Sequence, residues 1–164
     1  MTDVEVYTDS AIMGALSGVR SFSGPALVTR AASSGLLPAV GQNFLKHPAT
    51  SKGSLLLALG ELVFDKLPNT PSRLSLVPLI GRAITGGYTG ATVSHARRRS
   101  VYVGAAVGAL AAIGGAYVGY QLRQFLHRKA HLPQVLAGVA EDAILAGAAV
   151  VALRRLRHAQ PTRE

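Results

Sequence analysis

The sequence contains no cysteine and no tryptophan, and only 15% of its 164 residues are charged. Without cysteine, the chain cannot form disulfides, a thiolate nucleophile or a cysteine-based metal site. Soluble domains carry about 25% charged residues, so this chain has few polar side chains with which to cover a water-exposed surface. The shortage is typical of a membrane protein, and the mean hydropathy of +0.31 agrees with it.

Acidic residues are also scarce, since 8 Asp and Glu stand against 17 Lys and Arg, giving a net charge of +9. Such a charge raises nucleic acid as a partner. The basic residues, however, occur in clusters beside long apolar runs, and aromatic residues for base stacking are few. Basic clusters that flank apolar runs are typical of membrane spans. The sequence therefore predicts a lipid bilayer, and no nucleic acid, as partner.

The longest uncharged segment runs from Val101 to Leu122. As a helix it would be about 33 Å long, enough to cross a hydrocarbon core of about 30 Å. Period-2 alternation is sustained nowhere, so the whole chain is expected to be helical. The sequence predicts an all-α integral membrane protein, a multi-span helical bundle with broken or re-entrant helices. Further candidate spans are Leu132 to Leu153, Ser75 to Ala96 (interrupted by Arg82 and Gly86-Gly87), the short Gly53 to Lys66, and Ser10 to Leu45 with a break at residues 33–35 and at Pro38.

The basic residues also predict orientation and domain limits. Seven flank one side of the last two spans and three flank the other, so the positive-inside rule puts the C-terminus in the cytoplasm. We expect an acidic N-terminal tail at residues 1–9, one membrane domain at 10–153, and a basic cytoplasmic tail at 154–164. The seven are Arg97, Arg98, Arg99, Arg154, Arg155, Arg157 and Arg163, and the three are Arg123, Arg128 and Lys129.

Two short motifs indicate an internal repeat. RSFSG at residues 20–24 matches RAITG at 82–86, and each is followed by a helix that carries a carboxylate in an apolar setting. These features predict an inverted repeat, with one copy at about 10–68 and the other at about 75–153, as in many transporters. Chance matching is the alternative, because the chain contains 18 glycines.

Ionisable residues inside apolar segments are the candidate functional residues. A charge within a span is costly, so it faces a partner or a water-filled cavity. We expect Arg20 and Arg82 to face the bundle centre and approach Glu61 and Glu141, either within a half or across halves. The alternative is that such pairs only hold the bundle together. The predicted substrate or ion pathway comprises Arg20, Ser23, Arg82, Thr85, Glu61, Asp65, Glu141 and Asp142.

A stripe of glycines predicts close helix packing. Gly104, Gly108, Gly115 and Gly119 recur along the strongest span, and small residues at this spacing let a second helix backbone approach. The packing is expected within the chain or between protomers of a homo-oligomer. No motif for a metal, cofactor or nucleotide occurs, so none is expected.

The chain resembles the bacterial membrane proteins grouped as domain of unknown function 4126. The resemblance covers about Ser10 to Leu153 and is carried by SGVRSFSGPALV, LALGELVFDKLPNTPSR, GRAITGGYTGA and AEDAILAGAAVV. Its most specific part is the E-x-x-x-D-K-x-P core at residues 61–68. The resemblance implies a small multi-span protein of the bacterial inner membrane and supplies no activity.

These features predict a small transporter, channel or lipid translocator for an anionic solute or headgroup, because guanidinium groups bind phosphate and carboxylate. The main alternative is a non-transporting structural or assembly protein whose charge pairs and glycine stripes only stabilise an oligomer. A membrane enzyme ranks third, since no nucleophile or metal site is indicated.

Overall fold

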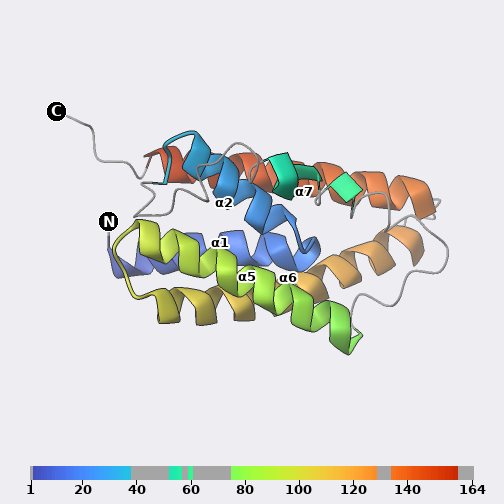
Figure 1. Ribbon diagram of the computed structural model, residues 1–164. Helices are drawn as coiled ribbons and strands as arrows, with labels where there is room; N and C mark the ends of the chain where they lie inside the picture. The colour runs from blue at the N-terminus through green and yellow to red at the C-terminus, as the bar shows by residue number, and fades with distance from the viewer. Residues whose placement is uncertain (1, 38–51, 57–58, 61–74, 129–133, 159–164) are drawn as a thin grey trace.

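The structure, a computed structural model, describes residues 2–37, 52–56, 59–60, 75–128 and 134–158 (Figure 1). These residues form helices and no strand, which confirms the expected all-helical class. The principal helices are α1 (Asp3–Val19), α2 (Ser23–Ser33), α5 (Leu76–Ala96), α6 (Val101–Arg128) and α7 (Gln134–His158).

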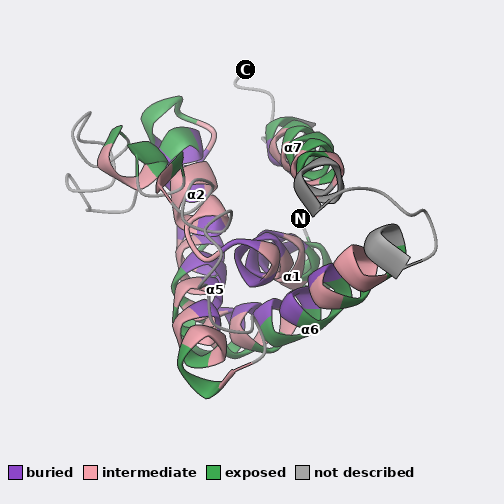
Figure 2. Ribbon diagram, turned by 90° about the vertical axis from the view of Figure 1, so that its right-hand side faces the viewer, coloured by how far each residue is buried: buried purple, intermediate pink, exposed green. Residues whose placement is uncertain are grey.

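Helices α1, α5 and α6 pack most closely. Helices α5 and α6 form an antiparallel hairpin, and α1 lies in the angle between them (Figure 2). Helix α7 runs antiparallel to α1 and is joined to it by two ion pairs, Arg20 with Asp142 and Asp9 with Arg155. Helix α2 contacts α1, α5 and α7.

Glycines make the close approach of the three central helices possible. A Cβ added at Gly14 of α1 would collide with the backbone of Gly108 in α6, and one at Gly90 of α5 would collide with the carbonyl of Gly104. Gly115 meets the backbone of Ala15 in the same way. The predicted packing glycines of α6 therefore lie at helix crossings, and Gly119, further along, is also buried.

The apolar core lies towards one end of the bundle. Its largest buried side chains are Met13 of α1, Val28 of α2, Val93 of α5 and Leu156 of α7, together with Leu37 after α2. These residues come from four helices or their ends, so they fix the arrangement around α1 by removing apolar surface from the solvent.

Helices α2 and α5 end in the same way. After α2, the N–H of Leu36 donates to the carbonyl of Ala31 and the N–H of Gly35 to that of Ala32, with Gly35 at φ +76°. After α5, Arg98 occupies the corresponding position at φ +56°. Glycine adopts this left-handed conformation without strain, whereas arginine does not. The break predicted at residues 33–35 therefore lies where α2 ends.

Only part of the membrane prediction is supported. Among the described residues, one helical segment, Val101–Phe125, is long and apolar enough to cross a bilayer. A multi-span bundle is not supported on this criterion, because α5 contains Arg82 and several hydroxyl residues and α7 contains central carboxylates and a basic end. The expected interruption of α5 at Arg82 and at Gly86-Gly87 is wrong, since the helix is continuous from Leu76 to Ala96.

The two arginine motifs have different local structures. RSFSG forms the break between α1 and α2, whereas RAITG lies inside α5. Pro25 accounts for the difference, because its ring would clash with the carbonyl of Ser21 in a continuous helix but is tolerated in the first turn of a new one. RAITG has no proline after it. The predicted repeat therefore has no support from the conformation of these two motifs.

Two terminal segments expected as tails are helical. Asp3 to Asp9 form the first turns of α1, which begins with a capping box between Thr2 and Glu5. Helix α7 continues through Arg154, Arg155 and Arg157 to His158.

Candidate functional site

Arg20 lies at the break between α1 and α2 and is buried, with 5% of its surface exposed. Its backbone is extended, which ends α1 and turns the side chain across to α7. There the guanidinium forms an ion pair with the carboxylate of Asp142, whose side chain is 19% exposed. The break between α1 and α2 therefore places the positive charge of Arg20 beside the negative charge of Asp142, 122 residues later in the sequence.

Arg82 is equally buried, at 4% exposure, but lies within a continuous helix. The two arginine motifs do share one local hydrogen bond. The Ser23 hydroxyl donates to the carbonyl of Arg20 at 2.8 Å, and the Thr85 hydroxyl donates to the carbonyl of Arg82 at 3.1 Å. Both hydroxyls predicted for the pathway therefore bond the backbone of their arginine three residues earlier.

The two arginines lie at similar depths in the bundle. Helices α1 and α5 are antiparallel, and the Ser17 and Thr89 hydroxyls lie 3.4 Å apart between them. Arg20 follows Ser17 by three residues and Arg82 precedes Thr89 by seven, so both lie on the same side of this contact. At 1.5 Å per helical residue, their Cα atoms differ in depth by about 6 Å.

Hydroxyl groups line the seam between α1 and α5. The Ser10 hydroxyl lies 3.0 Å from that of Ser94 and donates to the carbonyl of Gly90 at 3.2 Å. Ser10, Ser17, Thr89 and Ser94 are all fully buried or nearly so. The seam therefore joins the two helices by polar contacts, as is common where helices pack inside a bilayer.

The predicted partners of the arginines are found in part. Arg20 pairs with Asp142, the neighbour of the expected Glu141. Glu61 and Asp65 lie outside the described residues, as does the side chain of Glu141, so those expected pairings stay predictions. The structure brings together Arg20, Ser23 and Asp142 and places Arg82 and Thr85 at a similar depth.

A second ionic cluster lies at the end of the bundle where α1 begins, and sequence reasoning missed it. Asp9, expected in a tail, is 5% exposed and accepts a hydrogen bond from Nε of Arg155 at 3.3 Å. Asp3 pairs with Arg99 at 2.8 Å, and Arg97 donates to the carbonyl of Leu156 at 3.1 Å. Burial lowers the pKa of Arg97, and the nearby charge of Asp9 opposes this.

Helical spacing could have identified Asp9. It shares one face of α1 with Met13 and Leu16, at intervals of four and three residues. A carboxylate on the same face as two core residues is expected to be buried and paired.

No protein-family model, curated protein or solved structure matches the chain. The family resemblance therefore stays a prediction. Among the described residues, no group of three or more His, Asp or Glu side chains could hold a metal ion. The candidate site is thus the central layer of Arg20, Asp142 and Arg82.

Proposed function

We propose that the chain is an integral membrane protein whose central arginine layer binds an anionic group in transit across the bilayer. The observation that carries the membrane part is the exposure of many large apolar side chains around an interior that is partly polar. The buried side chains include Arg20, Arg82 and the hydroxyls of the α1–α5 seam as well as the apolar core, whereas many large apolar side chains of α5, α6 and α7 are exposed. Within α5 and α6, the most exposed of them are Tyr102, Val77, Leu76, Leu110, Ile84 and Val118, at 63–88%.

This distribution suits lipid better than water. In water, continuous apolar surface on a monomer is limited to a few hundred Å². In a bilayer, burying apolar side chains between helices yields little, and interfaces instead use small residues and interhelical hydrogen bonds. The glycine crossings and the hydroxyl seam have this character. Helices α5 and α7 also present apolar outer faces, which supports a multi-span arrangement with α6 as the most apolar span.

The transport part rests on the two arginines. A guanidinium inside a bilayer is costly and is kept where it has a partner or a function. Two of them at similar depth offer paired forks of N–H donors, which recognise phosphate and carboxylate groups bidentately. This layer suits an anionic substrate, either a solute or a phospholipid headgroup, that displaces Asp142 from Arg20. The resemblance to the family of unknown function agrees with a small membrane protein.

A structural role is the second candidate, and the Arg20–Asp142 pair favours it. Paired charges between α1 and α7 hold the two helices in register, and buried pairs specify packing in some proteins. On this alternative, nothing displaces Asp142, and the arginine-rich end of the bundle only sets orientation, with the C-terminus cytoplasmic.

A flux experiment separates the two roles. The protein is reconstituted into liposomes, and uptake of radiolabelled inorganic phosphate and translocation of a fluorescent phospholipid are measured in parallel. Arg20→Lys and Arg82→Lys keep the charge but remove the bidentate fork. We expect them to lower the flux about 10- to 100-fold, the value of one or two charge-assisted hydrogen bonds. Arg30→Lys is the matched control, because Arg30 is exposed in the last turn of α2.

Two outcomes would contradict the proposal. Flux equal to that of protein-free liposomes with both probes, from a folded wild type, would favour the structural role. Release of the expressed protein from membranes by alkaline carbonate, without detergent, would refute the membrane assignment itself.

A further inference from the structure

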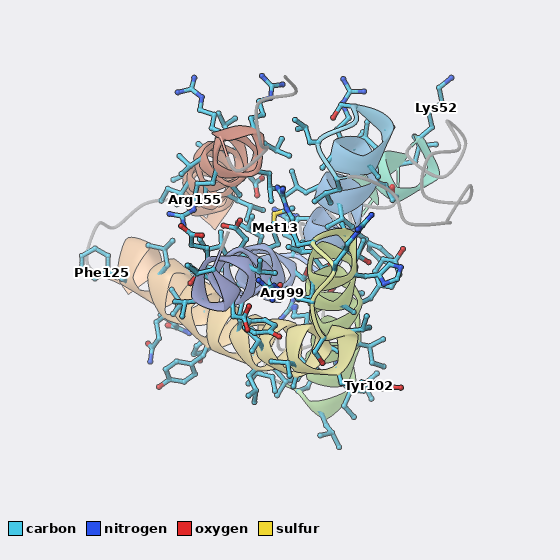
Figure 3. The ribbon with its side chains drawn as sticks, turned by 90° about the vertical axis from the view of Figure 1, so that its left-hand side faces the viewer. Met13, Lys52, Arg99, Tyr102, Phe125 and Arg155 are labelled. Carbon is cyan, nitrogen blue, oxygen red and sulfur yellow. The ribbon has the colours of Figure 1, made fainter. Side chains whose placement is uncertain are left out.

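One end of the bundle gathers arginines from two separate segments. Three form the turn between α5 and α6, and three lie in the last turns of α7, next to the start of α1. The contact of Arg97 with the carbonyl of Leu156 joins the two groups. We call this surface the arginine end; it comprises Arg97, Arg98, Arg99, Arg154, Arg155 and Arg157, and Figure 3 views the bundle from this side.

The carboxylates at this end do not neutralise it. Asp3 pairs with Arg99 and Asp9 with Arg155. Arg98, Arg154 and Arg157 are exposed and form no ion pair with any described residue. Glu5 is engaged with Thr2 of its own capping box. Among the described residues, three guanidinium groups of the arginine end therefore have no carboxylate partner and are exposed.

Exposed apolar side chains begin directly beside these guanidinium groups. Tyr102, only three residues from Arg99, is 88% exposed and points away from the bundle (Figure 3). On α7, Val150 and Val151 are 50% and 58% exposed and precede Arg154 by about one turn. The surface thus changes from basic to apolar within a few residues on two helices.

We propose that the arginine end binds the headgroups of anionic phospholipids in one leaflet. The guanidinium groups would hold the phosphates, and the adjacent apolar faces of α6 and α7 would lie against the acyl chains. Tyr102 occupies the level at which tyrosine is enriched at membrane interfaces. The inference rests on the proposed membrane location but does not depend on transport through the central layer.

A nucleic acid would fit this surface less well. Only three of the arginines have no carboxylate partner within the described part of the chain, and the apolar residues beside them offer nothing to a phosphate–sugar backbone. A phospholipid matches both parts of the surface, because one molecule carries an anionic and an apolar portion. Basic residues near anionic bilayers favour binding by about fivefold each.

The test is lipid retention by the detergent-solubilised full chain, measured by native mass spectrometry. Phosphatidylglycerol and phosphatidylcholine with identical acyl chains are titrated against wild type and against the triple variant Arg98→Gln, Arg154→Gln, Arg157→Gln. We expect wild type to retain phosphatidylglycerol more tightly and the triple variant to lose about a hundredfold in affinity. Arg123→Gln, at the other end of α6, is the control and should bind like wild type.

Several results would overturn the inference. Equal retention of the two lipids by wild type would show that charge is not recognised, and an unchanged triple variant would show that these arginines do not bind it. Full competition by glycerol phosphate, or tighter binding of a short DNA duplex, would assign the surface to a soluble anion or to nucleic acid. A chain that withstands carbonate extraction yet shows no lipid preference would refute this inference alone, leaving the membrane assignment intact.

Discussion

The helix crossing at Gly108 provides a quantitative test of the packing. A Cβ added there would collide with the carbonyl oxygen of Gly86 and lie 3.0 Å from the Cα of Gly90. Both neighbours belong to the backbone of α5, so neither can move aside as a flexible side chain would. Gly114, on the same helix, has no atom within 4 Å of an added Cβ. The effect of a glycine-to-alanine substitution can therefore be compared between a crowded position, Gly108, and an open one, Gly114.

The expected magnitudes follow from two opposing terms. Replacing glycine by alanine inside a helix favours folding by about 1 kcal/mol at either position. Overpacking costs about 1–3 kcal/mol, with the upper part of this range expected against a rigid backbone. The propensity term cancels in the comparison, so Gly108→Ala should be less stable than Gly114→Ala by about 1–3 kcal/mol. At about 3 °C per kcal/mol for a chain of this size, the difference in Tm is about 3–9 °C.

The assay is thermal unfolding in detergent micelles, followed by circular dichroism at 222 nm because the chain has no tryptophan to report by fluorescence. Gly114→Ala should melt at or above the wild-type temperature. A Gly108→Ala variant as stable as Gly114→Ala would contradict this packing, since α5 and α6 would then not approach through this glycine. Equal destabilisation by both variants would contradict it as well, because Gly114 would then be a packing position.

Three further changes are expected to have measurable effects. Arg98→Gly should raise stability by about 1 kcal/mol, because it removes the strain of a left-handed arginine; no rise in Tm would contradict this. Asp142→Leu should cost about 3 kcal/mol by removing the carboxylate that pairs with the buried Arg20, while Arg20→Met together with Asp142→Leu should be milder; strictly additive losses in the cycle of these two substitutions would argue against the pair. Hydrogen bonds with Thr2 lower the pKa of Glu5 below its ordinary 4.5, so they stabilise the first turn of α1 above that pH. This contribution is lost as the pH falls through the lower folded pKa, and Glu5→Gln should abolish the pH dependence of amide exchange in that turn.

The helices could be predicted from the apolar runs, because an apolar run of sufficient length is by itself enough to favour an α-helix. The start of α6 at Val101 follows from the basic turn before it, but its end at Arg128 lies beyond the predicted Leu122. Four of the six helical residues after Leu122 are polar or basic and still continue the helix, so hydropathy marks where the uncharged run ends and not where the helix ends. The break at Arg20 was not predicted, since the interruptions of this segment were expected at residues 33–35 and at Pro38; Pro25 is the signal in the sequence that marks it.

The ion pair of Arg20 with Asp142 illustrates what composition leaves open. Asp142 shares a face of α7 with Leu145, Ala152 and Leu156, which pack in or against the apolar core. That periodicity, present in the sequence, indicates that Asp142 lies on the inward face of α7. The pairing with Arg20 itself depends on how α7 is placed against α1, which no local pattern specifies.

The two ion pairs between α1 and α7 are important both for the structural role and for the transport role. Asp9 of α1 and Arg20 directly after it are 11 residues apart, and Arg155 and Asp142 are 13 apart on α7, so both pairs form only in one antiparallel register. In lipid, where apolar contact between helices contributes little, such polar contacts hold α7 in place. A substrate anion that competes for Arg20 would release one of these two attachments and leave the pair at the arginine end as a pivot. The residue that binds the anion would then also be the one that lets α7 move, which is why replacing Asp142 should alter flux and stability together.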